Sequence, residues 1–184
     1  MRYSPEQSEA TRKRILQAAG ELFRQHGFGG VGVDAIAKAA GVTSGAFYSQ
    51  FKSKADAFLA VAEEGLDRLH KGVEVFQGKY EADWFQAFIA YYLGAEHRED
   101  VGGGCALPSL SGEVARSEAE TRKAYEERLT RVAQLLAGGL ADAPSREAAW
   151  PILAQLAGGV MLARAVQDED LAREIAEAVR KSLR

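Results

Sequence analysis

The chain has little cysteine and no long apolar run. Its 184 residues include a single cysteine, Cys105, which cannot form a disulfide within the chain and fits a reducing compartment. No apolar run reaches the roughly 18 residues that a membrane-spanning helix needs, and the N-terminus lacks the apolar core of a signal peptide. The sequence contains no Cys/His cluster with metal-ligand spacing. These absences predict a cytoplasmic protein without a metal or other cofactor.

Charge is distributed unevenly along the chain, although the net charge is only −3. Residues 1–54 hold eight Lys or Arg against four Asp or Glu, whereas the remainder holds 15 against 22. A basic N-terminal part favours contact with phosphates, and an acidic remainder stays away from them. An ordinary solvated charge distribution is the alternative.

Residues 33–51 have the pattern of two short helices joined at one glycine. Gly41 separates them and supplies the residue type that adopts a left-handed backbone without steric cost. In the second helix, Phe47 and Phe51 repeat at i, i+4 and are expected to face inward. The first helix has apolar residues at i, i+3, i+4 and i+7, namely Val33, Ile36, Ala37 and Ala40. The pattern predicts a helix-turn-helix, with an ordinary helical hairpin as the alternative.

The second of these helices carries polar residues on its predicted outer face. Such a helix fits the major groove of B-DNA, where polar side chains near its start meet base edges and phosphates. The outward positions are Ser44, Gly45, Tyr48, Ser49 and Gln50. Thr43 or Ser44 is placed to cap its N-terminus, and Ser53 to cap the next helix. Lys54 lies at the start of that next helix, a position that predicts a phosphate contact.

Motifs within residues 11–54 resemble the TetR family of one-component transcriptional regulators. They are Thr-Arg-(x)2-Ile-Leu-(x)2-Ala at 11–19, Leu-Phe-(x)3-Gly-Phe at 22–28, Ile-Ala-(x)2-Ala-Gly-Val at 36–42 and Gly-Ala-Phe-Tyr-(x)2-Phe-(x)2-Lys at 45–54. The resemblance extends from Thr11 to about Asp67. It implies that Thr43, Ser44, Gly45, Tyr48 and Gln50 lie on the recognition helix and that Lys54 contacts phosphate. The sequence departs from the family at Val31-Gly32, Ser44 and Gln50, so the operator sequence does not transfer.

The resemblance and the helical spacing together predict an all-α protein. Residues 8–68 form a three-helix helix-turn-helix domain, with the motif itself at about 31–51. Residues 69–184 form a helical domain for ligand binding and dimerisation. In that domain Ser117-Glu118-Ala119-Glu120 has the form of a capping box, and residues 142–145 are expected to start another helix, which includes Pro151.

The two final helices are predicted to pair with their copies in a homodimer. Gly158-Gly159 lies inside the first of them and suggests close approach by another helix. The second has a single apolar stripe, Leu171, Ile175, Val179 and Leu183. We expect a four-helix bundle across a two-fold axis, which in the resembled family sets two recognition helices about 34 Å apart on a palindrome. Packing of both stripes inside one protomer is the alternative.

Candidate effector residues gather in the second domain. Aromatic side chains line ligand pockets between helices, although such a stripe is more often plain core. The candidates are Trp84, Phe88, Tyr92 and Tyr125, together with Cys105.

Cys105 follows three glycines and precedes Ala106-Leu107-Pro108, which predicts a position at a helix start. The helix dipole there lowers the pKa of a thiol, and His97, Arg98 and Arg116 are close enough in sequence to add positive charge. The segment 104–114 resembles a subgroup of TetR-type repressors that respond to electrophiles and oxidants through a cysteine. A small buried apolar residue is the alternative role.

We therefore predict a repressor, not an enzyme, that leaves a palindromic operator when a small molecule or an electrophile acts on the second domain. A thiol-dependent enzyme using Cys105 and His97 and a helical interaction protein without DNA binding are the alternatives. Neither explains the polar outer face that begins at Thr43.

Overall fold

A computed structural model of the protein describes residues 5–140 and 145–183, and its regular elements there are all helical. This confirms the predicted all-α class. In chain order the elements are α1 (Pro5–His26), α2 (Val33–Ala39), α3 (Ser44–Gln50), α4 (Lys54–Tyr80), the 3-10 helix η1 (Glu81–Asp83), α5 (Trp84–Tyr92), α6 (Ala95–Glu99), α7 (Ala106–Val114), α8 (Ala119–Gly138), α9 (Arg146–Ala165) and α10 (Glu169–Ser182).

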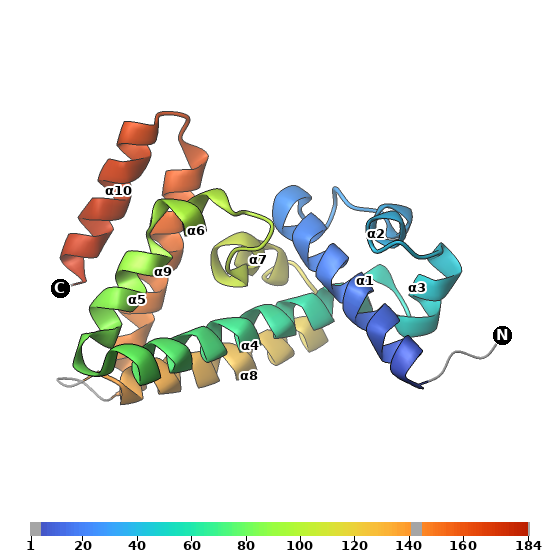
Figure 1. The fold of residues 1–184 in the computed structure, drawn as a ribbon, viewed down its shortest axis with the longest axis horizontal. Coiled ribbons are helices and arrows are strands. Elements are labelled where there is room, and N and C mark those ends of the chain that lie inside the picture. Colours follow the sequence, from blue (N-terminus) through green and yellow to red (C-terminus); the bar gives the residue numbers. More distant parts are fainter. Residues whose placement is uncertain (1–4, 141–144, 184) are drawn as a thin grey trace.

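Helices α1, α2 and α3 form the end of the molecule that contains the helix-turn-helix (Figure 1). Gly41 has a φ of +65° between α2 and α3, as the sequence predicted. The Thr43 hydroxyl accepts the N–H of Ala46 and caps α3. Phe47 and Phe51 are fully buried and anchor α3 against the other two helices. The turn glycine, the helix cap and the buried phenylalanines all match the helix-turn-helix that the sequence predicts.

Helix α4 connects this end to the rest of the chain without a break. The Ser53 hydroxyl accepts the N–H of Asp56 and starts the helix as expected. Helix α4 then lies beside α8 along the lower side of the molecule in Figure 1. The predicted domain boundary at residue 68 falls inside this helix, so one continuous helix joins the helix-turn-helix to the second part of the molecule.

The remaining helices build the second part around α4. Helices α5 and α9 stand across the far end of α4 and α8, and α10 packs on α9 at the side opposite the helix-turn-helix (Figure 1). Helix α9 begins at Arg146, after residues 141–144, which lie outside the described residues, and Pro151 lies inside it. Among the described residues, no helix is long and apolar enough to cross a membrane.

The expected capping box at 117–120 is wrong. The residue at the N-cap of α8 is Glu118, which makes no side-chain capping bond. The Ser117 hydroxyl donates instead to the Glu113 carbonyl at the end of α7. Ser117 follows Glu113 by four residues, so this local bond at the end of α7 competes with the capping role that the pattern at 117–120 predicts.

Candidate DNA-binding helix and effector cavity

The outer face of α3 is polar and largely exposed. The Tyr48 side chain is 58% exposed, and its ring is held edge-on against the buried Phe47. Thr43, Gly45 and Ser49 are also exposed. The sequence placed all of these on the outer face, and they lie side by side there.

Ser44 and Gln50 are half-buried and already hydrogen-bonded inside the protein. The Ser44 hydroxyl donates to Asp34 Oδ1 at 2.6 Å, which ties α3 to α2. The Gln50 amide donates to the Ser8 hydroxyl at 3.0 Å, which ties α3 to α1. Ser44 and Gln50, which the sequence predicts to contact DNA, therefore also fix the orientation of α3.

Arg12 fixes the C-terminal end of α3 from α1. One of its Nη groups donates to the Gln50 carbonyl at 2.8 Å, and the guanidinium lies 4.1 Å from the centre of the Phe51 ring. A helix end leaves carbonyls without intrahelical partners, so an arginine at this place satisfies one of them. The outer face of α3 is consequently presented on a braced helix.

Lys54 has an internal role that the sequence did not reveal. Its Nζ donates to the carbonyls of Phe28 and Val31, each at 2.9 Å, and lies 4.1 Å from the centre of the Phe28 ring. The ammonium has three N–H groups, so one is left for a phosphate. Lys54 thus joins the start of α4 to the loop between α1 and α2.

A cavity of about 130 Å³ lies in the second part of the molecule, beside the loop that precedes α7. Residues of α1, α4, α5, α6 and this loop line it: Arg24, Gly65, Arg68, Leu69, Gly72, Phe76, Phe88, Tyr91, Tyr92, His97, Gly103, Gly104 and Cys105. Three of the predicted effector residues, Phe88, Tyr92 and Cys105, are therefore brought together.

The two other predicted effector residues are held elsewhere in the core. Trp84 donates its indole N–H to the Gly139 carbonyl at 2.9 Å. The Tyr125 hydroxyl shares a hydrogen bond of 2.6 Å with the Ser111 hydroxyl, and burial raises its pKa to about 12. Neither side chain lines the cavity; both belong to the hydrophobic core.

Cys105 is the N-cap of α7, as predicted, and its sulfur accepts the N–H of Leu107 at 3.4 Å. The expected lowering of its pKa is wrong. Burial raises the pKa of the thiol and outweighs the opposing effects of the Tyr92 hydroxyl, the Leu107 N–H and the nearby cations. Those cations are Arg164 and Arg24, whereas Arg98 donates to the Ala172 carbonyl and Arg116 pairs with Glu113.

His97 holds the backbone next to Cys105 and does not act on the thiol. Its Nδ1 lies 2.6 Å from the Tyr92 carbonyl, and its Nε2 accepts the backbone N–H of Cys105 at 3.2 Å. This pattern requires a neutral ring protonated at Nδ1, and burial lowers the pKa of His97 accordingly. Because the Nε2 lone pair is occupied, His97 is not placed to take the thiol proton.

The loop before Cys105 is clamped from both sides by arginines. Arg24 Nε from α1 donates to the Gly102 carbonyl at 2.5 Å. Arg164 from α9 donates to the carbonyls of Arg98 at 2.8 Å and His97 at 2.9 Å. The cavity wall is thereby bonded to the helix-turn-helix on one side and to the last two helices on the other.

Comparison with known proteins identifies the N-terminal part. Residues 15–61 match the family described as "Bacterial regulatory proteins, tetR family". The N-terminal part of the chain is therefore a tetR-family domain.

Two relatives match a longer part of this chain than the family model does. The transcriptional regulator AcrR of Shigella flexneri is 37% identical over 82 residues, which are 45% of this chain and 38% of AcrR. The transcriptional repressor NemR of Escherichia coli K12 is 29% identical over 133 residues, 71% of this chain and 67% of NemR. The crystal structure of E. coli NemR in its reduced form has the same fold, with a TM-score of 0.77 and 23% identity, covering 93% of this chain and 95% of that one.

Sequence reasoning missed three arginines of this protein: Arg24, Arg68 and Arg164. Arg24 lies 78 positions from its partner Gly102, and Arg164 lies 66 from Arg98. The only local signal is Gly20, four residues before Arg24, where a Cβ would lie 3.2 Å from an Nη of that arginine. The absence of a side chain at Gly20 leaves room for this guanidinium to fold back over α1.

Proposed function

We propose that the protein is a repressor of transcription that binds a palindromic operator as a homodimer and is released by a small molecule in the Cys105 cavity. The observation that carries the proposal is the exposed polar face of α3 on a braced tetR-family helix-turn-helix. A short helix with such an exposed polar face fits the major groove. Operator DNA lies in the bacterial cytoplasm, so this function requires the protein to be there.

Base contacts are assigned to Thr43, Gly45, Tyr48 and Ser49, with Ser44 and Gln50 at the edges of the face. The exposed Tyr48 ring offers an apolar edge to a thymine methyl group and a hydroxyl to a phosphate or base. The remaining N–H of Lys54 is assigned to a phosphate. The excess of positive charge in residues 1–54 supports this orientation.

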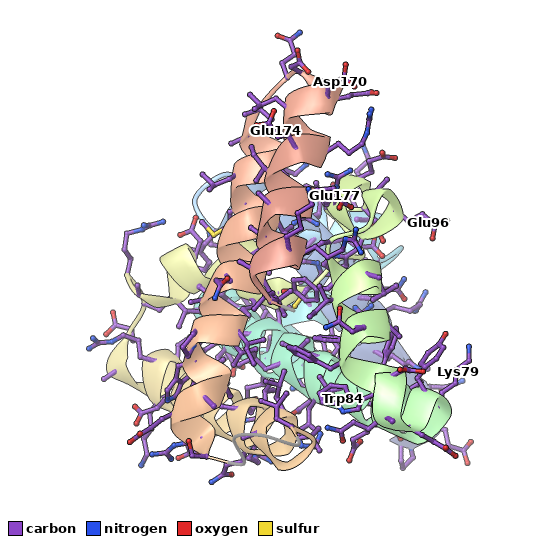
Figure 2. All side chains as sticks on the ribbon, turned by 90° about the vertical axis from the view of Figure 1, so that its left-hand side faces the viewer. Lys79, Trp84, Glu96, Asp170, Glu174 and Glu177 are labelled. Atoms are coloured by element: carbon purple, nitrogen blue, oxygen red, sulfur yellow. The ribbon has the colours of Figure 1, made fainter. Side chains whose placement is uncertain are left out.

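Dimerisation is assigned to α9 and α10. Met161 and Leu162 on α9 are 51% and 61% exposed, and Leu171 on α10 is 43% exposed. A Cβ at Gly159 would meet Val179 and Leu93 of the same protomer, whereas a Cβ at Gly158 would meet nothing. Gly158 therefore leaves room for a second copy. These two helices form the face seen in Figure 2, where Asp170 and Glu174 mark the outer end of α10.

Release is assigned to α4, α7 and the loop between residues 99 and 106. A ligand that enlarges the cavity displaces this loop, and Arg24 carries the displacement to α1. The similarity to NemR, a transcriptional repressor, and to AcrR, a transcriptional regulator, supports repression as the output.

A thiol switch is a second candidate, favoured by the position of Cys105 on the cavity wall. N-ethylmaleimide would add to Sγ, forming an S–C bond while the thiol proton moves to the maleimide carbon. If the reagent releases wild-type protein but not Cys105→Ser from DNA, the thiol is the sensor. Equal behaviour of the two proteins leaves only non-covalent ligands.

The test of DNA binding is a selection from random duplex DNA, followed by fluorescence anisotropy on the enriched site. We expect a palindrome, and a roughly tenfold loss of affinity for Tyr48→Ala from lost base contacts. Val75→Ala, at a residue 55% exposed on α4, is the matched control and should bind as wild type does. Absence of any enriched site contradicts the proposal, as does salt-insensitive binding that Tyr48→Ala leaves unchanged.

A further inference from the structure

Two arginines border the Cys105 cavity without a carboxylate partner. Arg24 and Arg68 both line it, and neither forms an ion pair with any acidic residue in the described part of the chain. The cavity lining itself includes no Asp or Glu. A buried charge normally has a partner, so the guanidinium of Arg24 requires an explanation, whereas Arg68 is exposed to solvent.

Arg24 is the more constrained of the two. Its side chain is only 9% exposed, and its one described hydrogen bond runs from Nε to the Gly102 carbonyl. Both Nη groups fold back over Gly20 and have no acceptor among residues 5–140 and 145–183. A guanidinium presents two Nη groups in a fork that fits a carboxylate. Arg24 is thus a buried cation whose two Nη groups are available to a ligand.

Arg68 stands beside Arg24 and shares the same loop. Its Nη2 donates to the Gly103 carbonyl at 3.3 Å, next to the Gly102 carbonyl that Arg24 binds. Repulsion from Arg68 adds to burial in lowering the pKa of Arg24, and Glu64 and Glu21 oppose it only through space. An anion between the two guanidinium groups would relieve this repulsion.

The rest of the cavity is apolar and small. Phe76, Phe88 and Tyr91 supply aromatic walls, and His97 is neutral. The Tyr92 hydroxyl is buried and lies beside the Cys105 thiol, yet it forms no hydrogen bond of standard geometry in the described structure. A volume of about 130 Å³ is below the roughly 300–1,000 Å³ of pockets for drug-sized molecules, so the ligand is about one ring in size.

We propose that the cavity binds a small ring-sized carboxylate, with its anionic group held between Arg24 and Arg68 and its apolar body against Phe88 and Phe76. The inference deepens the proposed function, because it names the chemical class of the releasing ligand. Since Arg24 belongs to α1, the carboxylate bonds directly to the helix that braces α3. Binding therefore attaches the ligand to the same guanidinium whose Nε holds the Gly102 carbonyl, and so couples the cavity to the loop and to the helix-turn-helix.

The test compares benzoate with its neutral analogue benzamide by isothermal titration on the full chain. We expect benzoate to bind at least tenfold more tightly than benzamide, because hydrogen bonds to a charged group are the stronger ones. Arg68→Met should lower benzoate affinity roughly tenfold and leave benzamide unchanged. Arg68→Lys should retain part of the preference, and Arg122→Met, at an exposed residue of α8, should retain all of it.

Arg24→Met is the decisive variant if its melting temperature stays near that of wild type, and it should abolish the preference for benzoate. If it fails to fold, the Arg68 series decides the question. Equal binding of benzoate and benzamide, or no binding of either, overturns the proposal. So does an Arg68→Met variant that weakens both alike.

Operator binding separates this proposal from the proposed function. Arginine-dependent benzoate binding by a protein that selects no DNA would retain the anion site and reject the regulator. A palindrome bound by a protein that does not discriminate benzoate from benzamide would do the reverse. If the protein binds a palindrome and also prefers benzoate to benzamide, benzoate should release the operator from wild type and not from Arg68→Met.

Discussion

Gly65 of α4 lies directly against Ala106 of α7, and a Cβ at position 65 would overlap the Ala106 side chain. The contact is one residue away from Cys105 and halfway along α4, the helix that leads back to the helix-turn-helix. Because packed helices shift as units rather than deform, a displacement of α7 is passed to α4 at this point. In the proposed mechanism the cavity would therefore reach the helix-turn-helix by two routes, Gly65 and Arg24.

Gly65→Ala is expected to destabilise the protein by about 1–3 kcal/mol, because the added methyl group separates α4 from α7. Urea unfolding followed by circular dichroism measures the change. Gly78→Ala is the control in the same helix, since a Cβ there meets nothing. It should stabilise by up to about 1 kcal/mol through helix propensity. Equal effects of the two substitutions would contradict the close contact.

Cys105 should react slowly with N-ethylmaleimide at pH 7, because burial raises the pKa of its thiol. The rate should increase about tenfold per pH unit up to and beyond pH 9, as the thiolate fraction grows. The raised pKa also means that stability falls as pH rises above the pKa of the unfolded thiol. A reaction rate that levels off below pH 8 would instead indicate a preformed thiolate.

His97 should make stability sensitive to acid. Its pKa is lowered in the folded protein, so its contribution is present above the unfolded value of 6.5 and is lost as pH falls through the folded value. Protonated Nε2 no longer accepts the Cys105 N–H. Urea midpoints at pH 7.5, 6.0 and 5.0 should therefore fall more steeply for wild type than for His97→Gln. Parallel curves would show that the ring does not couple to folding.

Leu162→Glu should convert the protein to a monomer. A glutamate at the centre of the proposed α9 interface would be buried without a partner, and we expect dimer affinity to fall by about two orders of magnitude. Sedimentation velocity at micromolar concentration measures this. Val75→Glu adds the same charge on α4 and should leave the dimer intact. A wild-type protein that sediments as a monomer would reject the interface itself.

The helix-turn-helix could be predicted from signals within a short stretch of the chain. Its signals are local: Gly41 sets a left-handed turn, Thr43 and Ser53 cap the following helices, and Phe47 and Phe51 lie one turn apart. Interactions of this kind span four residues or fewer, so they are visible in the chain before it folds. Cys105 at the start of α7 was predictable for the same reason.

The electrostatics of the Cys105 cavity depend on contacts between residues that are far apart in the chain. Burial reversed the expected effect of the helix dipole on Cys105, because desolvation acts on a charge from all sides whereas the dipole acts from one. The arginines that meet the Cys105 loop come from α1, α4 and α9, at positions far away in the chain. Contacts across such separations leave no periodic trace in the sequence, and they are formed only when the helices pack.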